Sequence, residues 1–196
     1  MKKLVIILLL SLAINCSALE RYVINCNRYL LLASRDSLYT QVGVKEKTNR
    51  NDGEKIEEYL KSVGRKRGDA YCAAGQYWCF LSASRDLKLS EEYIPIKKTG
   101  VAIEMFNDAK KRGIKTILKL DIDDLIFWKR RDSWRGHVER IIQVKQAGWI
   151  LTIGFNTSSG INGSQDNGNG VYVRNRNIYH PIGRLVVRGF IGFNAI

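Results

Sequence analysis

One cysteine stands where a nucleophile could be generated. Cys72 follows a basic stretch, residues 65–67, and we expect it near the start of a helix that opens close to Asp69. The free backbone N–H groups and positive end of a helix favour a thiolate, and the same groups can bind the oxyanion formed when sulfur attacks a carbonyl carbon. A small buried core cysteine is the alternative interpretation.

A cysteine nucleophile needs a general base near neutral pH, and the chain contains two histidines. His137 follows Gly136 at the start of an apolar run, so its ring can face outward at the end of a strand. His180 precedes Pro181 and is expected in a loop. The position at a strand start favours His137 as the partner of Cys72.

The imidazole requires a further group that fixes its orientation. The apolar run 149–153 is expected to form the strand beside that of His137, and Asn156 lies at its end. The Asn156 amide could therefore hold the second ring nitrogen. The alternative is an asparagine that only begins the turn of residues 157–160.

Helices are predicted in the first part of the chain. The apolar spacing indicates helices over residues 28–42 and after the turn 51–53, the second with Ile56, Tyr59 and Leu60 on its apolar face. A third is expected from about residue 69 through residue 80, and a fourth over residues 101–111, ended by Gly113.

Short β-branched and aromatic runs follow residue 114. Strands are predicted at 125–128, 137–142, 149–153, 171–173 and 185–187, with a polar loop at 158–170. Helices followed by strands indicate the α+β class, with N-terminal helices packed on a C-terminal antiparallel β-sheet.

The candidate residues lie in segments that resemble one enzyme family, the CHAP-type cysteine peptidoglycan hydrolases. Six segments occur in the family's order and span most of residues 41–190: 43–46, 51–53, 68–74, 124–128, 136–138 and 152–157. The resemblance implies a papain-like fold in a single catalytic domain, residues 19–196. It also implies a Cys72 nucleophile, a His137 base and an Asn156 orienting amide, with no metal or organic cofactor.

The sequence departs from the family's pattern at three positions. Gly154 replaces an acidic residue, so we expect a carboxylate that helps to orient the histidine to be missing. Glu139 replaces a glycine two residues after His137, and Tyr71 replaces the tryptophan that commonly precedes the nucleophile.

Three functions follow as hypotheses. The resemblance implies hydrolysis of an amide bond in bacterial peptidoglycan, by an N-acetylmuramoyl-L-alanine amidase or a stem-peptide endopeptidase acting through a Cys72 thioester. A catalytically silent wall-binding module on the same fold is the alternative, suggested by Gly154 and by the residues around Trp128, Trp134 and Arg135. A secreted nucleic-acid binder is suggested by charge alone, and no nucleic-acid partner is expected because the basic runs are short and scattered.

The first eighteen residues resemble a secretory signal peptide. Lys2 and Lys3 precede an apolar run that ends in small residues, with cleavage expected after Ala18. The run is shorter than the roughly 20 residues that cross a bilayer, so no transmembrane anchor is expected. Lipid attachment at Cys16 is the less favoured alternative. These features predict a secreted or periplasmic protein.

Removal of Cys16 would leave an odd number of cysteines: Cys26, Cys72 and Cys79. Cys72 and Cys79 are seven positions apart, about 10.5 Å along one helix, which is too far for a disulfide. Cys79 is expected in the core, with a bridge to Cys26 as one option. In an oxidising compartment at least one thiol then stays unpaired within the chain.

Composition limits the class of protein. The 196 residues are 45% hydrophobic, enough for one compact domain and too apolar for a disordered polymer. Four cysteines without paired metal-ligand spacing do not support a structural zinc site. The 32 basic and 19 acidic side chains give a net charge of +13, which favours an anionic partner such as peptidoglycan or another cell-wall polymer.

Overall fold

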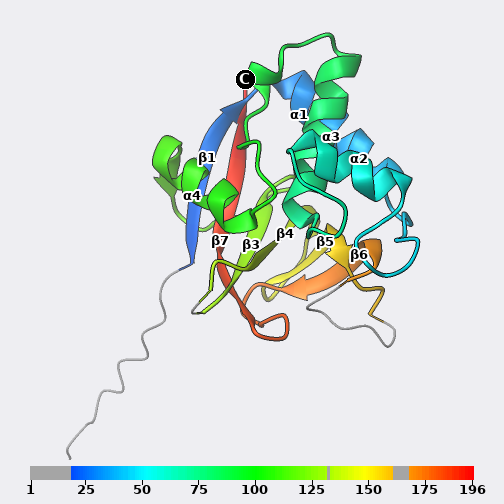
Figure 1. The fold of residues 1–196 in the computed structure, drawn as a ribbon. Helices are drawn as coiled ribbons and strands as arrows, with labels where there is room; N and C mark the ends of the chain where they lie inside the picture. Colours follow the sequence, from blue (N-terminus) through cyan, green and yellow to red (C-terminus); the bar gives the residue numbers. More distant parts are fainter. Residues whose placement is uncertain (1–18, 132, 161–167) are drawn as a thin grey trace, which may run out of the picture.

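A computed structural model describes residues 19–131, 133–160 and 168–196. The predicted signal peptide, including Cys16, lies outside the described residues. Within them, four α-helices and a seven-stranded sheet form a mixed α+β fold (Figure 1).

The sheet has the strand order β2-β1-β7-β3-β4-β5-β6. The strands are β1 (Glu20–Cys26), β2 (Ile114–Thr116), β3 (Leu125–Arg130), β4 (Gly136–Val144), β5 (Trp149–Thr157), β6 (Gly170–Asn177) and β7 (Leu185–Ala195). The five predicted strands correspond to β3 to β7. Strands β3, β4, β5 and β6 form an antiparallel series, and β7 joins β3 antiparallel on the other side.

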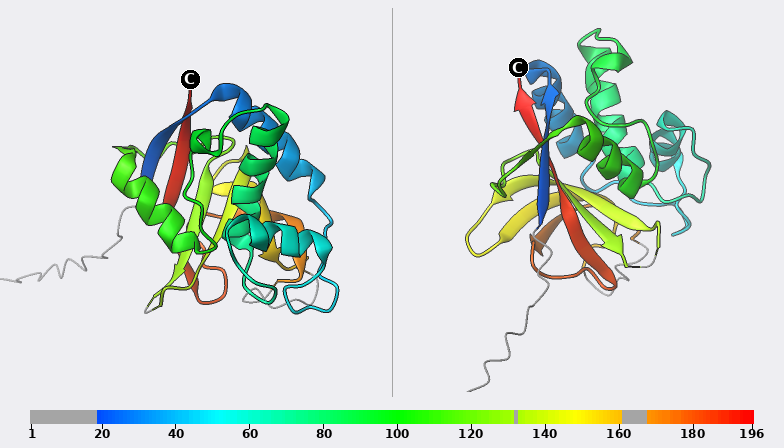
Figure 2. Two further views of the ribbon diagram at one scale, coloured as in Figure 1. Left: turned by 45° about the horizontal axis from the view of Figure 1, so that its top comes forward. Right: turned by 90° about the vertical axis from the view of Figure 1, so that its left-hand side faces the viewer.

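The prediction of a purely C-terminal, antiparallel sheet is wrong in one respect. Strand β1 comes before every helix and pairs with β7 in parallel, from Glu20 opposite Gly189 to Cys26 opposite Ala195 (Figure 2, right). Tyr22, Ile24 and Cys26 are buried at every second position, so β1 has the alternation of a strand with one face on the core. Parallel strands need a long connection between them, and here the residues between Cys26 and Leu185 provide it.

The helices cover one face of the sheet (Figure 2). They are α1 (Arg28–Thr40), α2 (Glu54–Ser62), α3 (Cys72–Asp86) and α4 (Ala102–Arg112), with a 3₁₀ turn at Glu91–Tyr93. The Asn27 side chain caps α1 by accepting hydrogen bonds from the N–H groups of Tyr29 and Leu30. The four predicted helices are therefore present, and the third begins three residues later than expected.

Helix α3 is the central helix of this layer. Eleven of its side chains are buried, from Cys72 to Ser84, and it contacts the other helices as well as β4 and β5. Gly75 permits the closest approach to the sheet: a Cβ there would lie 2.2 Å from the ring of Phe155 on β5. Because the ring fills that space, α3 is fixed against the strand next to β4.

A buried arginine joins α1 to β4. Arg140 is fully buried, donates to Asp123 Oδ1 at 3.0 Å and to Ser34 Oγ at 3.0 Å, and also reaches the Leu31 carbonyl. A buried charge is tolerated when it is paired and hydrogen-bonded in this way. Val138 belongs to the core cluster that the helices form with the sheet, and Arg140, two residues along β4, points to the same face.

Candidate functional site

Cys72 is the first residue of α3, at the end of the helix where backbone N–H groups lack intrahelical partners. The residue before it, Tyr71, provides no side-chain cap. The Cys72 sulfur lies 4.0 Å from the carbonyl oxygen of Gly136, the first residue of β4. The thiol therefore sits between a positive helix end and the strand that carries His137.

His137 lies beside Cys72. The imidazole hydrogen-bonds to the thiol, and its Nε2 lies 3.0 Å from Glu139 Oε1, which leaves Nδ1 as the nitrogen for the sulfur. Burial alone would lower the pKa of His137, but the bonds to Cys72 and Glu139 outweigh it and raise the pKa to about 9. The raised pKa means that the imidazole can take a proton from the thiol and hold it for donation.

Glu139 is the residue that holds the imidazole. Its carboxylate is fully buried and accepts from Arg176 at 2.5 and 3.0 Å and from Thr152 Oγ1 at 2.5 Å. Burial would raise the pKa of Glu139, but the Arg176 charge and His137 hold it well below its ordinary value. The carboxylate therefore stays ionised and can both orient the imidazolium and stabilise its charge.

Asn156 does not occupy the predicted position beside the histidine. Its Nδ2 donates to Asn51 Oδ1 at 2.9 Å, and Glu139 takes the place at Nε2. The backbone of Asn156 has φ of 51° at the irregular end of β5, where the pairing with β6 shifts register. This local turn directs the amide toward Asn51, which lines the pocket that contains Cys72. Asn156 thus contacts a residue of the cleft wall, Asn51, instead of the His137 imidazole.

The expectation of a missing carboxylate is also wrong, for a reason that lies in strand register. Glu139 on β4 and Gly154 on β5 are directly paired, so their side chains would share one space. A Cβ at Gly154 would lie 2.7 Å from Glu139 Oε1. Relative to the family's pattern, the acid and the glycine have exchanged strands, and a carboxylate still lies at the imidazole.

A sequence signal for Glu139 was available. A residue two positions after His137 points to the same face of a strand, and an acidic residue in the otherwise apolar run that follows the histidine needs a buried partner. That the replacements at 139 and 154 belong together follows only from the register that pairs them.

The other candidate base lies elsewhere. His180 belongs to the connection between β6 and β7, and its ring is 5.9 Å from that of Trp149 in an edge-on arrangement. Tyr71, the third departure, is buried and its hydroxyl donates to Glu46 Oε1 at 3.1 Å. Glu46 also accepts from the N–H of Asn51, so this tyrosine supports the loop that forms one wall of the cleft.

The suggested bridge between Cys26 and Cys79 is absent: both thiols are free and buried, as is Cys72. Cys26 belongs to the core cluster around β1 and α4, and Cys79 to the one around α2 and β5. Burial raises the pKa of each of these two thiols to about 12. Neither has the features of a nucleophile.

The Cys72 site opens into a pocket of about 320 Å³. Its lining comes from the start of α3, the start of α4, the β3–β4 hairpin and the loop at Asn51, and includes Arg130, Trp134 and Arg135. A substrate can therefore reach the sulfur from solvent, while His137 and Glu139 stay almost entirely covered.

Within the described ranges, no group of three or more His, Cys, Asp or Glu side chains could bind a metal ion. No helix there is long and apolar enough to cross a bilayer. Comparisons of the chain with protein-family models, curated proteins and solved structures gave no match.

Proposed function

We propose that the protein is an exported cysteine hydrolase that cleaves an amide bond in bacterial peptidoglycan, as an N-acetylmuramoyl-L-alanine amidase or a stem-peptide endopeptidase. The observation that carries the proposal is the thiol of Cys72 at a helix N-terminus, against a histidine held by a buried carboxylate. The resemblance of the six segments supports the substrate class and a papain-like fold.

The reaction begins when His137 takes the proton of the Cys72 thiol and Cys72 Sγ attacks the carbonyl carbon of the substrate amide. The first backbone N–H groups of α3 stabilise the oxyanion, the C–N bond breaks, and His137 gives its proton to the departing amine. Water then attacks the thioester while His137 accepts a proton from it. The C–S bond breaks, releasing a carboxylic acid and restoring the Cys72–His137 pair.

Purified sacculi provide the test. The protein should release soluble fragments, and Cys72→Ala should lower the rate by about 1000-fold or more because no thioester can form. Cys79→Ala, the same change two turns along α3, is the matched control and should retain release. Equal release by the parent and Cys72→Ala would refute the proposal. Mass spectrometry of the new termini distinguishes the amidase from the endopeptidase.

A silent wall-binding module is the second candidate. It is favoured by the rim of the cleft, where Trp134 is 70% exposed beside Arg130 and Arg135. This candidate predicts that the protein sediments with sacculi and releases nothing. Its original motivation, the loss of an acid at position 154, is weakened because Glu139 supplies the carboxylate.

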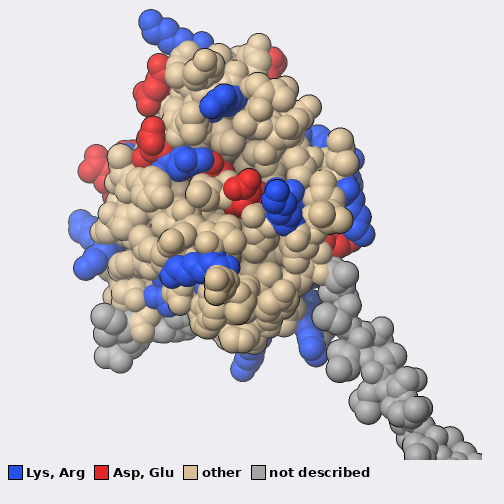
Figure 3. Space-filling model, turned by 180° about the vertical axis from the view of Figure 1, so that it is seen from behind, with Lys and Arg blue, Asp and Glu red and all other residues tan. Residues whose placement is uncertain are grey.

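The basic side chains on one face of the molecule favour a wall polymer over a nucleic acid. On the face in Figure 3 the Lys and Arg side chains lie as separate groups, with acidic side chains among some of them. A nucleic-acid groove is expected instead to gather its cations along one track. Tight, saturable binding of duplex DNA at physiological salt would overturn this preference.

A further inference from the structure

Two pockets adjoin the one that contains Cys72. The Cys72 pocket shares Val101 and Trp134 with the first, and shares Arg130 and Arg135 with the second. We name the first the Trp134 arm and the second the arginine arm. Each arm is therefore within reach of a substrate whose amide lies at Cys72.

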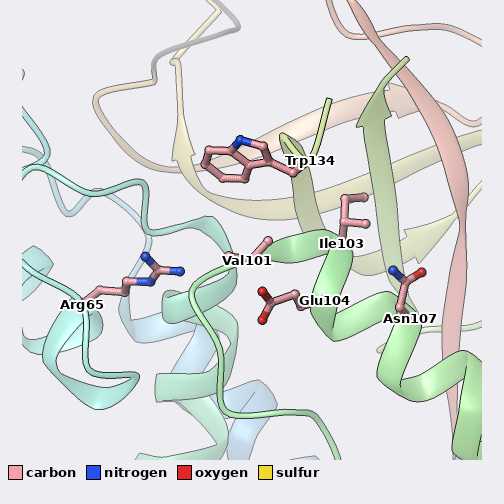
Figure 4. Close-up of a pocket in the computed structure, with 6 residues that line it drawn as sticks. All are labelled: Arg65, Val101, Ile103, Glu104, Asn107 and Trp134. Atoms are coloured by element: carbon pink, nitrogen blue, oxygen red, sulfur yellow. The ribbon is translucent and has the colours of Figure 1, made fainter. Parts of the chain in front are cut away.

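The Trp134 arm is mixed in character. Figure 4 shows the Trp134 ring above Val101 and Ile103, and shows the Arg65 and Glu104 side chains pointing toward each other across the pocket. The volume is about 460 Å³. An aromatic wall over an apolar floor, with one charge of each sign, suits a ring-shaped or uncharged group.

The described residues that line the arginine arm carry one sign of charge. The residues that line it are Arg130, Arg131, Ser133, Arg135 and Arg184, in a pocket of about 650 Å³. Among the described residues, none of these four guanidinium groups is ion-paired. By contrast, Arg21, Arg140 and Arg176 are each bound to a carboxylate of the fold. The arm thus offers several planar donors that fit carboxylates.

We infer that the arginine arm selects substrates with free carboxylates next to the scissile amide, so that the substrate is an acidic peptide. This inference rests on the proposed function, since it assigns one end of the substrate in the same cleft. Two of the four arginines also line the Cys72 pocket. A carboxylate bound there fixes the substrate a short distance from the sulfur, and the attraction weakens with salt because the arm is open to solvent.

The test compares sacculi with the same sacculi after carbodiimide coupling to ammonium, which converts free carboxylates to neutral amides. Binding is measured by co-sedimentation with the Cys72→Ala protein, so that it is independent of turnover. We expect about 10-fold tighter binding to untreated sacculi. Arg130→Gln/Arg135→Gln should abolish the preference, and Arg131→Gln/Arg184→Gln, which changes residues that do not line the Cys72 pocket, should reduce it.

Arg28→Gln/Arg85→Gln is the control, because it removes the same charge at exposed positions on α1 and at the far end of α3. It should keep the preference. Equal binding to both kinds of sacculi, an unchanged preference in Arg130→Gln/Arg135→Gln, or an equal loss in the control would overturn the inference. Carboxylate-dependent binding without fragment release by the parent would refute the hydrolase and leave the acidic-peptide site. Fragment release together with equal binding to both kinds of sacculi would refute the acidic-peptide site and leave the hydrolase.

Discussion

Cys72 and Cys79 belong to one helix and are both buried, yet their surroundings differ in every respect that controls thiol chemistry. Cys72 begins the helix, adjoins the His137 imidazole and lines an open pocket. Cys79 lies two turns along, among the apolar side chains of α2 and β5, where burial raises its pKa to about 12. Position in the helix, rather than residue type or depth, separates a candidate nucleophile from a core residue.

The largest expected effect is on alkylation. At pH 6.5, iodoacetamide should modify Cys72 at least about 1000-fold faster than Cys79 or Cys26, because thiols with a pKa of about 12 contain almost no thiolate at that pH. Peptide mapping by mass spectrometry after timed labelling measures the three rates in one sample. Similar rates at all three cysteines would remove the distinction, and a slow Cys72 would favour the silent module.

A smaller effect, on kcat, is expected from the Glu139 carboxylate that holds the histidine beside Cys72. Glu139→Gly should lower kcat for fragment release about 100-fold, because the imidazole loses its carboxylate. Gly154→Glu alone should also be impaired, since its Cβ would lie 2.7 Å from Glu139 Oε1. The double variant Glu139→Gly/Gly154→Glu returns the acid from the paired strand and should recover to within about 10-fold of the parent. Failure of the double variant to exceed either single variant, while its circular dichroism stays that of the parent, contradicts the exchange.

The smallest expected effect is on the pH dependence of the free energy of unfolding, through the histidine beside Cys72. The pKa of His137 is raised from 6.5 to about 9 in the folded protein. A raised pKa contributes stability that is fully present below pH 6.5 and is lost as pH rises through about 9, on the order of 3 kcal/mol. The free energy of unfolding in urea should therefore fall more between pH 6 and pH 10 in the parent than in His137→Gln. An equal fall in both would mean that the charge beside Cys72 is not held by His137.

The sequence was sufficient for elements with local signals. The apolar spacing located α1, and the β-branched runs located β3 to β7. Strand β1 was missed because its seven residues follow the predicted signal peptide directly, and its partner β7 is at the other end of the fold. Parallel pairing between such distant segments has no local sequence signal.

The same distinction applies to the site. Cys72 and His137 were found because a helix start and a strand start are local features, and the structure places them together. The role of Glu139 could not be predicted in this way, because it depends on strand register. Glu139 on β4 is paired with Gly154 on β5 and binds Arg176 on β6. Asn156 was assigned to the base from its place at a strand end, whereas the irregular pairing there turns it to Asn51.

The parallel pair of β1 and β7 also sets an order for folding. Asn25 and Asn194 hydrogen-bond although 169 positions separate them, and β7 lies between β1 and β3 in the sheet. Closing so long a loop is slow and is rewarded only when residues 185–195 are present. A polypeptide that emerges N-terminus first would thus leave β1 unpaired with β7 until those residues followed.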